Sequence, residues 1–176
     1  MENELYPRIY DKDVLEFLTV STEFCVRMEQ TAGTELRELV GTLLKILPLL
    51  YVKALVLDNS VPEAEGEAEQ LVTETDYEYV RTSVSQVLGA YDDYLDVFVE
   101  DMKYSDRPVR STISENLADI YQDLRNFAGI YKQGYPEVMQ VALWDVSENF
   151  KIYWGQRLVN VMRPLHEIYL SLGEEA

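Results

Sequence analysis

The chain has 176 residues, of which 47% are hydrophobic and 27% charged, the composition of a globular rather than a disordered protein. This length fits one domain with a sizeable core, and 8 glycines with 6 prolines are too few for a turn-rich all-β fold. The net charge of −17 argues against binding to nucleic acid or to anionic membranes, because both attract basic proteins. It either keeps the protein soluble or favours a basic protein partner.

The cysteine content and the apolar segments indicate the cellular compartment of the protein. Cys25 is the only cysteine, so neither an intrachain disulfide nor a four-cysteine zinc site can form, and its apolar neighbours predict a buried thiol. The N-terminus lacks the basic and apolar regions of a signal peptide. The longest apolar run, residues 43–57, contains Lys45, Lys53 and Pro48 and is too short to span a bilayer. We therefore expect a cytoplasmic protein without a membrane segment.

The first two of five to six expected helices cover about residues 13–30 and 34–57, and no segment shows a strand pattern. The first is amphipathic. The second begins amphipathic and becomes apolar nearly all round, which predicts a helix surrounded by others.

An acidic loop is expected at residues 58–75. No Lys or Arg occurs between Lys53 and Arg81, and such uniformly negative stretches are usually solvated and mobile. Within this loop four glutamates alternate with small residues: Glu63, Glu65, Glu67 and Glu69.

The next helix is expected to open with a capping box formed by Thr75 and Glu78 and to end at Gly89. A short segment rich in tyrosine and aspartate follows, at residues 91–102.

Two long helices complete the chain. Thr112 and Glu115 form a second capping box, and Gly134 ends that helix. Pro136 suits the first turn of the last long helix, which reaches about residue 163 and continues toward residue 172. We expect this last helix and the second one to form the centre of an all-α, single-domain bundle with short connections.

Most catalytic motifs are missing from the sequence. The single histidine, His166, excludes the paired Glu-x-x-His motifs of a di-iron bundle and the His-Glu-x-x-His motif of a zinc protease. No glycine-rich phosphate loop occurs, and a Cys25–His166 pair would lack an orienting third group. We therefore predict no cofactor and no catalytic residue.

Two sets of acidic residues have the spacing that aligns side chains on one helix face. Oxygen ligands in such a row suit Mg²⁺, Ca²⁺ or Mn²⁺. A helical wheel turns most of the second set away from the apolar face, so a solvated surface explains it better and no metal site is predicted. The first set is Asp92, Asp96 and Glu100, and the second is Glu115, Asp119 and Asp123.

Four segments of the chain are recognisable, at residues 88–94, 117–124, 154–159 and 163–166. Together they resemble the uncharacterised bacterial family DUF5063. The resemblance covers most of the chain and implies an all-helical fold without implying an activity. Members of this family often have histidine beside the Trp154-Gly155 pair; Tyr153 and Arg157 stand there in this chain, which weakens a metal or acid–base role. Gly155 is expected to let a neighbouring helix approach closely.

Three functional hypotheses remain open. The leading one is a non-catalytic, cytoplasmic helical module that binds a basic protein partner. A homo-oligomeric scaffold is another, since the sequence does not give the oligomeric state. The third is a small-molecule- or divalent-metal-dependent enzyme with a polar pocket between the last two long helices. Without any ligand, Asp119 and Asp123 could instead pair across the bundle with Arg157 or Arg163 as an interhelical salt bridge near the surface. The candidate lining residues of the pocket are Asp119, Tyr121, Asp123, Trp154, Arg157 and His166.

Overall fold

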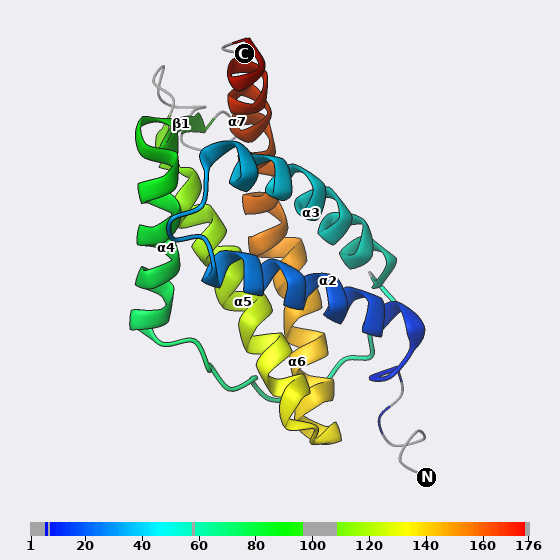
Figure 1. Cartoon of the computed structure of the whole chain (residues 1–176). Helices are drawn as coiled ribbons and strands as arrows, with labels where there is room; N and C mark the ends of the chain where they lie inside the picture. Colours follow the sequence, from blue (N-terminus) through cyan, green and yellow to red (C-terminus); the bar gives the residue numbers. More distant parts are fainter. Residues whose placement is uncertain (1–5, 7, 58, 97–108, 175–176) are drawn as a thin grey trace.

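The computed structural model of the chain describes residue 6 and residues 8–57, 59–96 and 109–174, and it is predominantly helical, which confirms the all-α prediction. Figure 1 shows the long helices packed around one another, with a small β-hairpin at one end. The elements in chain order are α2 (Lys12–Glu29), α3 (Leu36–Leu57), α4 (Glu74–Leu88), a 3₁₀ turn (Gly89–Asp92), β1 (Asp93–Asp96), β2 (Val109–Thr112), α5 (Ile113–Gln133), α6 (Pro136–Asn149), a π-helical turn (Phe150–Trp154) and α7 (Gly155–Glu174).

Most helix ends lie where the sequence places them. The Thr112 hydroxyl accepts a hydrogen bond from the Glu115 amide, and Gly134 ends α5 with φ +80°, a conformation that glycine adopts readily. Pro136 occupies the first turn of α6, as predicted. The predicted capping box of α4 is wrong by two residues: the observed box pairs Thr73 with Asp76.

The centre of the bundle is α5, which packs against α2, α4, α6 and α7. Its core includes a group of aromatic rings, in which Phe17 lies 5.4 Å from Phe127 and 6.2 Å from Trp154 between ring centroids. The prediction that the second helix is surrounded by others is wrong. Figure 1 shows α3 crossing the outside of the bundle, and side chains such as Val52 are about half exposed there.

The helix α3 is long and apolar enough to cross a membrane by length and composition, with a mean hydropathy of 1.9. The helix starts at Leu36 and so extends beyond the apolar run at residues 43–57, which was expected to be too short to span a bilayer. Core helices of bundles meet the same criterion, and one face of α3 packs into the shared core through seven side chains: Leu39, Val40, Leu43, Leu47, Leu50, Ala54 and Leu57.

A two-stranded antiparallel sheet replaces the helix that the Asp92–Asp96–Glu100 spacing required. Asp93 to Asp96 form β1, which pairs with β2. The buried Asp92 carboxylate accepts hydrogen bonds from the Ser114 amide (2.7 Å) and hydroxyl (2.6 Å), so it caps the first turn of α5. This metal hypothesis is therefore wrong for Asp92 and Asp96, while Glu100 lies outside the described residues.

Candidate functional site

A polar cluster lies where α4, α5 and α7 meet. Asp119 on α5 accepts a hydrogen bond from the Tyr77 hydroxyl of α4 (2.8 Å) and one from the Arg157 Nε of α7 (3.1 Å). The Arg157 guanidinium lies 3.8 Å from the centre of the Tyr153 ring, a cation–π contact. The predicted pairing of Asp119 with Arg157 is confirmed, and Asp119 is well satisfied.

One turn further along α5, Asp123 is poorly satisfied. Its Oδ2 is buried and has no hydrogen-bond partner among the described residues. Burial raises the pKa of Asp123 to about 7; the carboxylates of Asp119 and Asp145 also raise it, and Arg157 lowers it. Near neutral pH this side chain therefore exchanges between a carboxylate and a neutral acid.

A cavity of about 30 Å³ adjoins Asp123. That volume holds a water-sized group and excludes a metabolite. Within the described part of the chain, no three His, Cys, Asp or Glu side chains are placed to hold a metal ion. The geometry therefore offers no substrate-sized site at this position. Polar residues lining the cavity are Gln70, Asp123, Asn126, Asp145 and Asn149.

One wall of this cavity belongs to the acidic segment at residues 61–72, hereafter the strap. Asn126 of α5, itself buried, accepts hydrogen bonds from the Leu71 and Val72 amides at 2.7 and 2.8 Å, and its side-chain amide donates to Gln70. A Cβ on Gly129 would lie only 2.7 Å from Leu71 Cδ1, so this glycine makes room for the leucine. The strap is thus bound to α5 by polar and apolar contacts.

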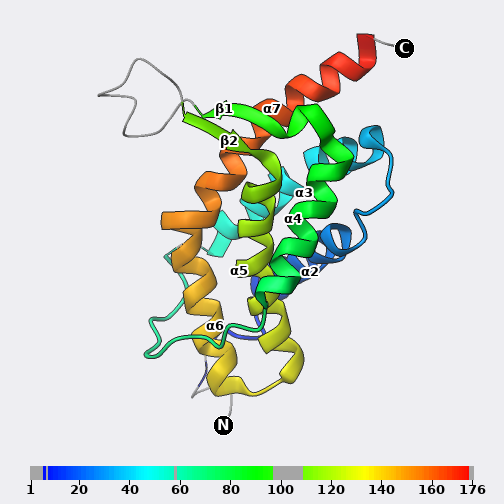
Figure 2. The same ribbon diagram turned by 90° about the vertical axis from the view of Figure 1, so that its left-hand side faces the viewer.

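The strap is also bound to α6. The Ala68 amide donates to Asp145 (2.8 Å), and the Gln140 side chain donates to the Pro62 carbonyl (3.2 Å). Figure 2 shows the strap crossing α6 on its way to α4. The expectation of a mobile loop is therefore wrong for its backbone. Its acidic side chains are solvated as expected, because all four alternating glutamates are exposed: Glu63, Glu65, Glu67 and Glu69.

A π-helical turn between α6 and α7 contains Tyr153 and precedes Arg157, two residues of the cluster. The Gly155 amide donates to the Phe150 carbonyl, five residues back, and a Cβ on Gly155 would lie 2.3 Å from that oxygen. Gly155 is thus required by its own helix and not, as expected, by a neighbouring one. Such turns frequently occur at functional sites. Here the turn directs Tyr153 to the cluster and Phe150 toward Tyr51 of α3, with ring centroids 5.2 Å apart.

The six predicted pocket residues do not form one pocket. Asp119, Asp123 and Arg157 lie together. On another side of α5, the Tyr121 hydroxyl donates to Glu29 of α2 (2.7 Å). Trp154 is fully buried, with its indole N–H donating to the Val146 carbonyl (2.9 Å).

His166 is exposed and far from the cluster. It follows Arg157 by nine residues on α7, a separation of about 13 Å along the helix axis. Arg163, the other predicted partner of the aspartates, instead contacts Glu167 (3.3 Å) and the Leu95 carbonyl (2.5 Å).

Sequence reasoning missed four residues that shape the site: Tyr77, Asn126, Asp145 and Tyr153. A signal existed for Asp145, because Asp145, Asn149 and Gln156 recur at the spacing of one helix face within a largely apolar segment. Tyr77 and Tyr153 carry no such signal, because tyrosines at helical spacing usually lie in the core.

Comparisons with known proteins place the chain in a family. The model of DUF5063, a domain of unknown function, matches residues 8–171. The chain belongs to this family. A crystal structure of protein BF1032 from Bacteroides fragilis is similar, with 41% identity, a TM-score of 0.78 and coverage of 91% of this chain and 94% of that one. No curated protein matches the chain.

Proposed function

We propose that this DUF5063 protein is a non-catalytic interaction module of the cytoplasm that binds a basic protein partner along the strap and the start of α4. The observation that carries the proposal is a row of exposed carboxylates on a backbone held against the bundle. Between residues 59 and 80 there is no Lys or Arg, and all seven acidic side chains are exposed: Glu63, Glu65, Glu67, Glu69, Glu74, Asp76 and Glu78.

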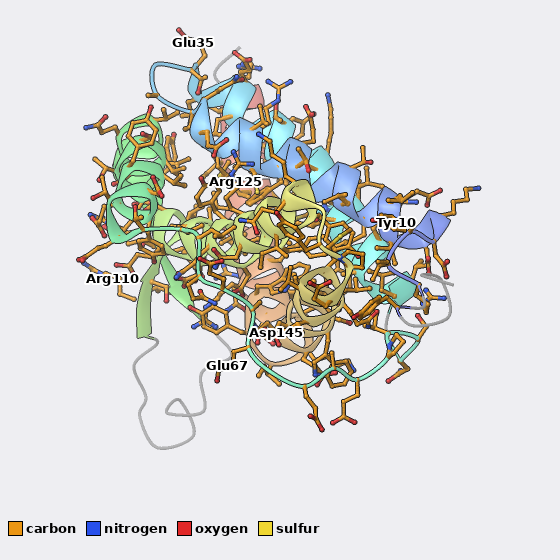
Figure 3. All side chains as sticks on the ribbon, turned by 90° about the horizontal axis from the view of Figure 1, so that it is seen from below. Tyr10, Glu35, Glu67, Arg110, Arg125 and Asp145 are labelled. Carbon is orange, nitrogen blue, oxygen red and sulfur yellow. The ribbon has the colours of Figure 1, made fainter. Side chains whose placement is uncertain are left out.

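The anchored backbone makes the strap a suitable docking element. In the strap the glutamates point outward, and Ala64 and Ala68 between them are half-buried. Figure 3 shows Glu67 pointing away from the bundle beside Asp145. Since Asn126 and Asp145 already hold the strap backbone, a partner would bind it with little further loss of conformational entropy.

A charge-matched pair of variants tests this proposal. In the strap variant Glu63, Glu65, Glu67 and Glu69 become glutamine. In the control variant the same number of exposed glutamates elsewhere become glutamine: Glu35, Glu38, Glu115 and Glu137. Both lose four negative charges. Binding of a fluorescent lysine-rich peptide is measured by anisotropy at about 50 and 200 mM salt, a range over which screening weakens charge contacts.

We expect the strap variant to bind the peptide at least about tenfold more weakly and to lose most of the salt dependence of binding. The control variant should keep most of the affinity and most of the salt dependence. Equal losses in the two variants would mean that only net charge matters, which contradicts the proposal. A pull-down from native cytosol at low salt then identifies the partner, and a partner retained by the strap variant would also contradict it.

A further inference from the structure

From Leu39 to Leu57 the outer face of α3 is apolar and carries no acidic side chain. Residues 39–57 contain two lysines and no Asp or Glu, in a chain whose net charge is −17. Lys53 is held by Glu16 of α2 (2.8 Å) at the margin of this face. The exposed side chains along its middle are Lys45, Pro48, Leu49, Val52, Leu55 and Val56; the last four are 46–54% exposed.

We propose that this face binds a second copy of the chain, with two α3 helices packed antiparallel about a twofold axis at Val52. A twofold interface must be self-complementary, since a residue i that contacts j requires j to contact i. The exposed positions satisfy this condition around Val52. Pro48 would face Val56 of the second copy, and Leu49 would face Leu55.

Charge permits a second copy on this face and favours this orientation. Two strongly acidic chains repel each other wherever acidic surfaces meet, and the α3 face avoids that repulsion. In the antiparallel arrangement Lys45 of one copy lies near the carboxyl end of the other α3. That end carries partial negative charge and has no basic residue in its last turn, so a lysine is favourable there.

The interface is expected to be reversible. Stable interfaces involve about 20–30 residues on each side, and this stripe has five exposed apolar side chains. The dimer population should therefore rise with protein concentration. This inference does not depend on the proposed function of the strap, which lies on another part of the surface.

Sedimentation velocity across a concentration series tests the dimer. Val52→Glu would place two carboxylates at the axis, and we expect it to weaken association at least about tenfold. Val138→Glu is the matched control, because Val138 is also exposed (40%) but lies on α6; it should leave association unchanged. A monomer at every concentration, or an equal effect of the two variants, would overturn the proposal.

Cross-linking tests the geometry. The only native cysteine, Cys25, is fully buried and therefore unreactive, so a single introduced cysteine reports on its own position. The axes of packed helices lie about 8–10 Å apart, so a short bismaleimide of similar length should link two Val52→Cys copies. Lys45→Cys copies would lie about 20 Å apart and should not be linked.

Linking of the Lys45→Cys copies in preference to Val52→Cys would overturn the antiparallel arrangement. Association of a monomeric wild-type chain with phosphatidylcholine vesicles, abolished by Val52→Glu, would assign the face to membranes and overturn the proposal as well.

Discussion

The outer face of α3 and the strap follow each other in the chain, yet their surfaces are opposite in character. Residues 39–57 expose aliphatic side chains and lysines, whereas residues 59–80 expose only acids among their charged side chains. In the two proposals above, this separation of charge lets one small protein bind different partners on two surfaces. The first would associate through apolar contact, and the second through electrostatic attraction.

The two segments are also attached to the bundle in different ways. The inner face of α3 packs through aliphatic side chains, whose burial does not depend on pH. The strap is attached through Asn126 and Asp145, beside an Asp123 that titrates near neutrality. The two attachments should therefore respond differently to mutation and to pH, and three predictions use that difference.

The largest effect is expected at the π-helical turn, which packs against Tyr51 of α3 through Phe150. Gly155→Ala places a Cβ against the Phe150 carbonyl and should lower the free energy of unfolding by about 3 kcal/mol, measured by urea denaturation. Gly41→Ala is the control: Gly41 lies inside α3 with no atom near the new Cβ, so this variant should gain about 1 kcal/mol. A tolerated Gly155→Ala would show that the turn is not required.

The second prediction releases the strap while sparing α3. Asn126→Ala leaves the Leu71 and Val72 amides without their acceptor and should cost about 2–3 kcal/mol. Hydrogen exchange at these two amides should accelerate more than exchange in α3. Asn149→Ala, in the wall of the same cavity, is the control and should have a smaller effect. Unchanged exchange at residues 71 and 72 would refute the anchoring role of Asn126.

The third prediction concerns pH. The folded-state pKa of Asp123, about 7, lies above the ordinary aspartic acid pKa of 3.8, so the folded chain binds this proton more tightly. The associated stability is fully present below about pH 4 and is lost as pH rises through 7. Asp123→Asn mimics the neutral acid and should therefore add about 2 kcal/mol at pH 8 relative to wild type, and much less at pH 5.

Asp145→Asn is the matched control for the pH prediction. It weakens the acceptor of the Ala68 amide and should destabilise the protein at both pH values. The loss should be slightly smaller at pH 8, because the change also removes a charge that raises the pKa of Asp123. An equal gain from Asp123→Asn at both pH values would show that Asp123 does not titrate in this range.

The sequence alone determined the helical fold and several helix ends. Periodic apolar residues, Thr112 before α5 and Gly134 after it are local signals, because each acts through residues one or two turns away. Asp119 and Arg157 were singled out correctly because opposite charges on neighbouring helices can pair. The same reasoning predicted Asp123 but not its unsatisfied oxygen, which depends on burial.

Only the tertiary structure decided which faces are covered. The composition of α3 suggested a surrounded helix, but α5 occupies the centre and α3 keeps an exposed side. The acidic strap had the composition of a mobile loop, yet Asn126 and Asp145, more than 50 residues away in sequence, bind its amides. Such contacts depend on which elements meet in space. A pattern within one segment fixes its own helix or turn, and its partners are fixed by the packing of the whole chain.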